Sequence, residues 1–136
     1  MEKQTKVVDA SVVIKWFLEE INSGKAFEIW QKHSSKEIFL IVPELIFSEV
    51  LNSLRYKKLN EEELKKVNIS LWDCKFNIEM TSKILFEKAI DIALKYNFTI
   101  YDSIYIALAQ IHETELITAD EELAKAPNVK LLNDIK

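Results

Sequence analysis

The sequence predicts an α/β domain of three layers, in which helices cover both faces of a central, mostly parallel sheet of four or five strands. Two patterns lead to this prediction. Short runs of strand-forming residues alternate with longer amphipathic segments along the whole chain, without an intervening linker or repeat. The clearest runs are apolar at nearly every position, as expected of parallel strands that are covered on both faces.

Length and composition indicate that residues 1–136 form one globular domain with a substantial core, since 49% of them are hydrophobic and 29% charged. The net charge of −4 argues against broad, sequence-blind binding to nucleic acid, but it allows local basic patches. The single glycine, Gly24, excludes a phosphate-binding loop and a dinucleotide-binding turn. The single cysteine, Cys74, cannot form an internal disulfide, and no apolar run approaches the ~20 residues of a membrane span. We therefore expect a cytoplasmic protein.

In chain order, strands are expected where short runs of apolar and β-branched residues occur. These runs are residues 6–8, 38–42, 75–78 (a short edge strand), 114–118 and 129–132. Helices are expected where apolar residues recur at intervals of three and four. These segments are residues 11–18, from 22 or 23 to 33, 43–58, a helix that follows Asn60, from 81 or 82 to 96, and one that begins near residue 99.

The segment after Asn60 is rich in charge. Asn60 is placed to cap a helix, and the acids that follow it stand four residues before lysines, Glu61 before Lys65 and Glu62 before Lys66. Pairs of this order and spacing stabilise a helix. We interpret the run as a solvated helix face and not as a binding site.

Three aspartates lie at or near strand-to-helix junctions. Asp9 follows the first strand, Asp120 follows the strand at 114–118, and Asp102 lies in the first turn of the preceding helix. Each could simply be a helix N-cap or a first-turn acid. Parallel strands share one direction, however, so Asp9 and Asp120 reach the same sheet edge, and the helix start at Asp102 can come beside them. Ligands of open α/β sheets bind beyond this edge.

A fourth acid is expected from the helix that Pro43 begins, because the missing N–H of proline suits a first helical turn. This helix offers Glu44 and Glu49. Glu49 lies roughly 60° from Ile46, at the border of the apolar face, and Ser53 one turn later leaves room beside it, which favours Glu49 only modestly. Clustered carboxylates repel one another unless a cation joins them, and oxygen ligands select Mg²⁺ or Mn²⁺.

The other polar residues predict no site. His33 and His112 lack a cysteine or a second histidine at ligand spacing, so zinc is not expected. Cys74 is expected in the core or at a helix end. The tryptophans are expected to pack in the core or at an interface, and these are Trp16, Trp30 and Trp72.

Four segments stand out together: Val-Val-Asp-Ala-Ser-Val-Val-Ile-Lys-Trp-Phe (7–17), Pro-Glu-Leu-Ile-Phe-Ser-Glu-Val-Leu-Asn (43–52), Tyr-Asp-Ser-Ile-Tyr-Ile-Ala-Leu-Ala (101–109) and Leu-Ile-Thr-Ala-Asp-Glu-Glu-Leu (116–123). In order and spacing they resemble the PIN-domain ribonucleases, and most of all the VapC toxins of VapBC toxin–antitoxin pairs. The resemblance extends along essentially the whole chain.

The resemblance implies that four acids bind the metal and carry catalysis, namely Asp9, Glu49, Asp102 and Asp120. It thereby selects Glu49 over Glu44. Ser11 matches a small hydroxyl position that often supports the first acid, and Asn52 and Thr118 are further supporting positions of the matched motifs. Ala119 stands where many relatives carry another acid or an asparagine.

The family implies hydrolysis of RNA phosphodiester bonds with Mg²⁺ or Mn²⁺, usually by a homodimer. It also implies an antitoxin of VapB type, which inserts a basic side chain among the acids. Metal held by the acids would lower the pKa of a bound water and stabilise charge in the transition state. Candidates for RNA contacts are Lys15, Arg55, Lys57 and Lys58, although each could equally serve solubility alone.

Two other functions compete. A Mg²⁺-binding phosphoreceiver-like domain would need a nucleophilic aspartate after a central strand and a lysine just after a later strand, where Ala119 and Asp120 stand instead. A catalytically silent PIN-like module that binds RNA or protein is the second alternative. Retention of all four acids argues against it.

Overall fold

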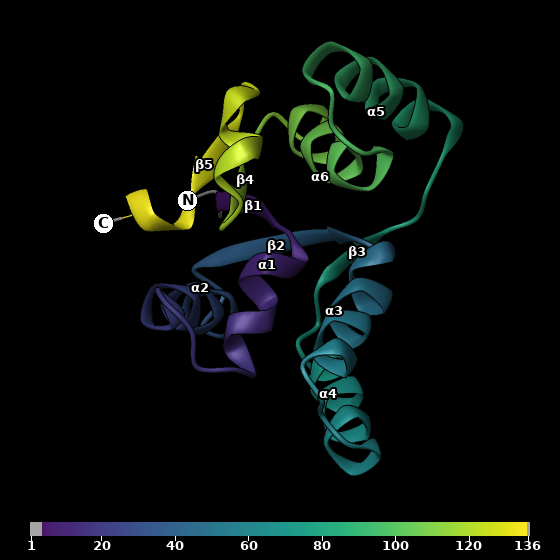
Figure 1. The fold of residues 1–136 in the computed structure, drawn as a ribbon. Coiled ribbons are helices and arrows are strands. Elements are labelled where there is room, and N and C mark those ends of the chain that lie inside the picture. The colour runs from purple at the N-terminus through teal and green to yellow at the C-terminus, as the bar shows by residue number, and fades with distance from the viewer. Residues whose placement is uncertain (1–3, 136) are drawn as a thin grey trace.

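The computed structural model describes residues 4–135, and a sheet of five parallel strands crosses its centre (Figure 1). The strands are β1 (Gln4–Val8), β2 (Ile38–Pro43), β3 (Asn77–Glu79), β4 (Leu116–Thr118) and β5 (Val129–Leu131). Their order in the sheet is β3-β2-β1-β4-β5, so the first strand of the chain is central. Val7 pairs with Ile41 on one side and with Leu116 on the other. The predicted α/β sheet of four or five strands is confirmed.

Helices cover both faces of this sheet (Figure 1). The α-helices are α1 (Ala10–Val13), α2 (Ser23–Ser34), α3 (Leu45–Tyr56), α4 (Glu61–Asp73), α5 (Lys83–Tyr96) and α6 (Ile100–Ile111). Three short 3-10 helices complete the described chain: η1 (Ile14–Trp16), η2 (Glu121–Lys125) and η3 (Leu132–Asp134). In Figure 1, α1, α2 and α3 lie on one side of β2, whereas α5 and α6 lie on the other.

Strand order reverses between β1 and β4. From β1 the chain moves outward to β2 and β3, and it then crosses by α5 and α6 to β4 on the other side of β1. The crevice outside such a switch point is where open α/β sheets bind ligands. Both strands that flank it end in a predicted site residue, Asp9 after β1 and Asp120 two residues after β4.

The core explains why α6 is so apolar. Every residue of α6 from Ser103 to Ala109 is buried, because the helix packs between the sheet and α5. α5 covers α6 with Leu85, Ala89 and Ile92. Among residues 4–135, no helix is both long and apolar enough to cross a membrane.

Several predicted boundaries need correction. Pro43 is the last residue of β2 and does not begin a helix, because the Glu44 N–H still donates to the Glu79 carbonyl beyond it (3.3 Å). The helix starts at Leu45, and it ends at Tyr56 because Lys58 has a left-handed backbone (φ 75°). The first helix begins at Ala10, earlier than predicted, and tightens into η1 after four residues.

The cap and the ion pairs predicted for the charged helix α4 are confirmed. The Asn60 side chain accepts from the Glu63 N–H, and the Glu63 carboxylate accepts from the Asn60 N–H, both at 2.9 Å. The pairs four residues apart are also formed and exposed, at 3.4 Å for Glu61–Lys65 and 3.3 Å for Glu62–Lys66. The face is solvated, as expected.

Candidate active site

Asp9 lies at the centre of the candidate site, at the junction between β1 and α1. It is the N-cap of α1, and its Oδ1 accepts from the Ser11 N–H (3.1 Å) and the Ser11 hydroxyl (2.5 Å). Its Oδ2 accepts from the Thr118 hydroxyl (2.5 Å). The N-cap alternative is therefore true of Asp9, but capping alone does not explain why this residue is only 6% exposed and also accepts a hydrogen bond from Thr118 of β4.

Ser11 and Thr118 fasten the ends of β1 and β4 to each other. The Ser11 hydroxyl, while donating to Asp9, accepts from the Ala119 N–H (2.9 Å). The Thr118 hydroxyl likewise accepts from the Asp120 N–H (3.1 Å). Two neutral hydroxyls thus connect Asp9 to the segment that carries Asp120.

The Asp9 carboxyl is electrostatically costly in its ionised form. Burial raises its pKa to about 6, and the charge of Asp102 adds to the rise. The hydrogen bonds from Ser11 and Thr118 oppose this rise without cancelling it. A carboxyl of this kind is stabilised by any cation that reaches it.

Glu49 projects from α3 toward the same region. Burial raises its pKa, the hydrogen bond from Tyr105 opposes the rise, and the charge of Asp102 adds to it. Tyr105 donates to Glu49 Oε1 at 2.5 Å and is itself 1% exposed. Glu44, the rejected alternative, is exposed.

Tyr105 is a site residue that the sequence reasoning did not select. Burial and the nearby charges of Glu49, Asp9 and Asp102 all raise its pKa, so its hydroxyl stays protonated and serves as a donor. A signal was available, because Tyr105 stands one helical turn after Asp102 in a quoted motif. However, an aromatic ring at this position is equally typical of a residue that only packs in the core.

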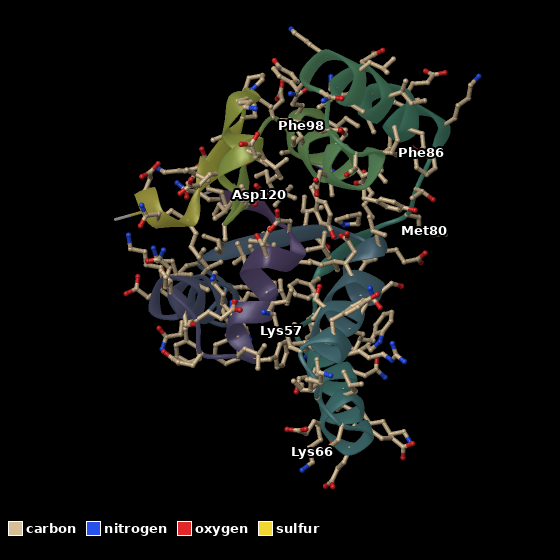
Figure 2. The ribbon with its side chains drawn as sticks, in the orientation of Figure 1. Lys57, Lys66, Met80, Phe86, Phe98 and Asp120 are labelled. Atoms are coloured by element: carbon tan, nitrogen blue, oxygen red, sulfur yellow. The ribbon has the colours of Figure 1, made fainter. Side chains whose placement is uncertain are left out.

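Asp102 and Asp120 complete the set. Asp102 is half-buried in the first turn of α6, whose N-cap is Thr99. Burial raises the pKa of Asp102, the hydrogen bond with Thr99 opposes the rise, and the charge of Asp120 adds to it. Asp120 is exposed, caps η2 through the Glu122 N–H (3.0 Å), and lies beside β4 in Figure 2.

The four acids suit a divalent cation in their chemistry. Asp102 links them, because its charge acts on both Asp9 and Glu49 and it feels that of Asp120. None of the four forms an ion pair within residues 4–135. In the described conformation no three His, Cys, Asp or Glu side chains of these residues already form a metal-binding group. The carboxylates would have to draw together around a cation of the Mg²⁺ type.

The remaining candidates lie outside this group. Asn52 is exposed on α3, and no hydrogen bond from it to the acids is formed in the described chain. Lys15 and Lys57 both form ion pairs with Glu20, at 3.4 and 3.2 Å. Arg55 and Lys58 are exposed near the end of α3.

The residues that predicted no site have structural partners. The Leu40 N–H donates to His33 Nδ1 (3.3 Å), so His33 Nε2 carries the proton and donates to the Cys74 carbonyl (2.7 Å). His112 pairs with Glu79 at 2.7 Å. Cys74 is a free thiol that caps the end of α4 and packs against the core, as predicted.

Sequence comparison identifies relatives along most of the chain. The sequence model of the PIN domain family matches residues 6–129. Ribonuclease VapC3 of Pyrobaculum aerophilum is 31% identical in an alignment over 125 residues that covers 88% of this chain and 92% of that protein.

Solved structures share the fold at lower identity. A chain of a toxin–antitoxin complex from Klebsiella pneumoniae has a TM-score of 0.73 at 22% identity, over 96% of this chain and 99% of that one. Mycobacterium tuberculosis VapC20, described as a sarcin–ricin loop cleaving toxin, has a TM-score of 0.71 at 16% identity, over 91% and 96%. At such identities the likeness shows the fold alone.

Proposed function

This chain belongs to the PIN domain family, and we propose that it is a metal-dependent endoribonuclease, the toxin of a toxin–antitoxin pair. The observation that carries the proposal is that the charge of Asp102 acts on Asp9 and Glu49 and is affected by that of Asp120, while none of these four acids has a cationic partner within residues 4–135. Its curated relative is named a ribonuclease, and acids of this arrangement suit Mg²⁺ or Mn²⁺.

In this mechanism the chain's residues have distinct tasks. Asp9, Glu49, Asp102 and Asp120 would hold the cation, which would supply an activated water and stabilise the charge that develops on the phosphate. Ser11 and Thr118 orient Asp9 by donating to its two oxygens. Tyr105 orients Glu49 and, because its pKa is raised, keeps its own proton. Neutral donors of this kind fix the carboxylates without neutralising them.

The test is to incubate purified, partner-free protein with cellular RNA in Mg²⁺ and in EDTA, and to sequence the RNA ends. Defined new ends in Mg²⁺ that are absent in EDTA and absent with Asp9→Asn are expected. RNA that stays intact in Mg²⁺ and in Mn²⁺ contradicts the proposal and favours a catalytically silent module that binds RNA or protein.

The phosphoreceiver-like alternative has little support. It needs a lysine just after a later strand, and the positions after β4 hold Ala119 and Asp120. Both oxygens of Asp9 are also occupied by hydroxyl donors. Failure of an acyl-phosphate donor to label the protein would remove this alternative.

The partner in this proposal is an antitoxin of VapB type that places an arginine or lysine among the acids. An uncompensated group of carboxylates is what an arginine fork satisfies. Co-purification from the native source, followed by inhibition assays with the recovered partner, tests this. A partner that binds without reducing cleavage contradicts the idea that it plugs the site.

A homodimer is the second part of the assembly, and the outer face of α5 supports it. That face and the preceding loop carry exposed apolar residues: Met80, Ile84, Phe86, Ile90 and Leu94. Figure 2 shows Phe86 and Met80 on this side of the molecule. Because the opposite face of α5 already packs on α6, this helix is apolar on two faces, and the second suits a second copy. Sedimentation equilibrium of Leu94→Lys should give the monomer mass.

A further inference from the structure

A cluster of three charges lies where η1 comes close to the end of α3. Lys15 of η1 and Lys57, the C-cap of α3, both approach Glu20, at 3.4 and 3.2 Å. The two lysines come from different elements, and Glu20 lies in the loop that follows η1. One carboxylate is thus held between two ammonium groups.

The cluster lies at the end of α3 that is farther from the sheet edge carrying Asp9. α1 and α3 follow neighbouring parallel strands, so both start at the sheet edge that carries Asp9, and they pack against each other. Glu49 and Lys57 are eight residues apart on α3, which is about 12 Å along a helix. That distance corresponds to roughly three or four nucleotides of a stacked strand. In Figure 2, Lys57 lies beside η1, well away from Asp120.

The charges are only partly screened by water. The side chains of Lys15, Glu20 and Lys57 are 11%, 29% and 47% exposed. Burial acts to raise the pKa of Glu20, but the hydrogen bond from Lys57 and the charge of Lys15 hold it below its usual value. Glu20 is therefore ionised at neutral pH, and the cluster carries one net positive charge.

We propose that Lys15 and Lys57 form a docking point for an RNA phosphate, and that Glu20 occupies it in the RNA-free protein as an internal substitute for that phosphate. The inference rests on the proposed ribonuclease function and deepens it. A carboxylate held by two lysines marks a position that suits a second anionic oxygen group. RNA must displace Glu20 to bind there, so Glu20 is a specificity-determining residue that weakens attachment to any polyanion lacking contacts with the acids.

The experiment measures binding and cleavage separately. Binding of a fluorescent, mixed-sequence single-stranded RNA is followed by anisotropy in EDTA over a range of salt concentrations, and cleavage of the same RNA is followed in Mg²⁺. The variants are Glu20→Gln, Lys57→Gln and Lys15→Gln. The matched controls are Glu62→Gln and Lys66→Gln, which alter an exposed ion pair on α4 away from this cluster.

Glu20→Gln should tighten RNA binding about two- to five-fold, lower KM and leave kcat unchanged, because the Glu20 carboxylate no longer competes with the phosphate for the two lysines. Lys57→Gln and Lys15→Gln should weaken binding and reduce the salt slope by about 0.7 each. A residue that served only structure would not tighten binding when removed. Because Lys15 is the more buried lysine, Lys57→Gln gives the cleaner comparison.

This inference is overturned if Glu20→Gln binds RNA no more tightly than the wild type does, or less tightly than Glu62→Gln does. An unchanged salt slope in Lys57→Gln also overturns it. Failure of the proposed function looks different, because the wild type would then bind RNA with these same variant effects but leave it uncut in Mg²⁺.

Discussion

The acidic residues of α4 and those at the switch point of the sheet differ in the partners that their carboxylates have. On α4 each first-turn acid has a partner: Lys65 for Glu61, Lys66 for Glu62 and the Asn60 N–H for Glu63. At the switch point the acids receive hydrogen bonds from neutral groups and no ion pair within residues 4–135. One group satisfies its charges internally, and the other leaves them for something else to satisfy.

The charged side chains of α4 stabilise the folded protein, whereas the ionised acids at the switch point destabilise it. Exposed pairs four residues apart contribute a few tenths of a kcal/mol each to their helix. The raised pKa of Asp9, Glu49 and Asp102 shows that ionising them opposes folding in the absence of a cation. Such a stability cost is common where a site is built for function. Four predictions test this difference, from the largest effect to the smallest.

The largest effect is expected from Asp102→Asn, which removes the charge that links the other acids. Cleavage should fall by orders of magnitude, because the cation loses a ligand. The metal-free variant should nevertheless be as stable as the wild type, or more stable by up to about 1 kcal/mol, because repulsion is relieved. Cleavage assays beside thermal melts in EDTA and in Mg²⁺ measure both quantities.

The stability gained on adding Mg²⁺ should also shrink in Asp102→Asn. The helix itself should survive, because Thr99 and not Asp102 is the N-cap of α6. Wild-type cleavage with an unchanged response to Mg²⁺ would reduce Asp102 to an ordinary first-turn acid of that helix.

The second effect is a pH dependence of stability that Asp9 confers. Its folded pKa of about 6 exceeds the value of 3.8 expected when unfolded, so the folded protein binds the proton more tightly. The stabilisation is complete below about pH 4 and is lost as the pH rises to about 6, a fall of about 3 kcal/mol in the free energy of unfolding. Denaturant titrations in EDTA across this range measure it.

Asp9→Asn is the control, since asparagine keeps a cap and cannot titrate. The difference in unfolding free energy between the two proteins should therefore change across the window, in favour of the wild type at low pH. Parallel curves for the two proteins would show that Asp9 is as well solvated as an exposed carboxyl.

Tyr105→Phe should have the third largest effect. It removes the donor to Glu49, and the loss should destabilise the protein by about 1 to 2 kcal/mol, at the low end for a charged hydrogen bond because Glu49 is half exposed. That donor also lowers the pKa of Glu49, so its removal should move the acidic limb of the cleavage–pH profile to higher pH.

Tyr56→Phe is the matched control, because Tyr56 is 75% exposed on the same helix as Glu49. It should change neither stability nor the pH profile. A Tyr105→Phe profile that coincides with the wild type would make Tyr105 a core residue only.

Residues whose roles depend on local pattern were predictable from the sequence. The strand that delivers Asp9 ends in two buried valines, Val7 and Val8, and topology alone brings Asp120 to the same edge. Asn60 is followed by the acids that a capped helix prefers. These features are set by neighbours in the chain, so periodicity and turn chemistry reveal them.

Residues whose roles depend on contacts across the fold were not predictable. Tyr105 and Glu49 are 56 positions apart in the sequence. Hydrophobic periodicity predicts how deeply each residue is buried, but it does not predict that the two are in contact. Lys57 meets Glu20 only because α3 runs back past η1. Pro43 was misplaced because the partner that extends β2 beyond it, Glu79, lies on a later strand. The choice of Glu49 over Glu44 came from family resemblance.

The smallest effect belongs to the other side of the comparison, the cap of α4. Asn60→Ala removes the acceptor for the Glu63 N–H, and it should destabilise the protein by about 1 kcal/mol. For a domain of this size that is a fall of roughly 4 °C in Tm. Because α4 carries none of the four acids, cleavage by the folded variant and the stabilisation by Mg²⁺ should match the wild type. Asn60→Asp, which keeps the acceptor, should restore the Tm. A loss of cleavage in Asn60→Ala without a loss of stability would show that the start of α4 takes part in the reaction, and the division between the two regions would fail.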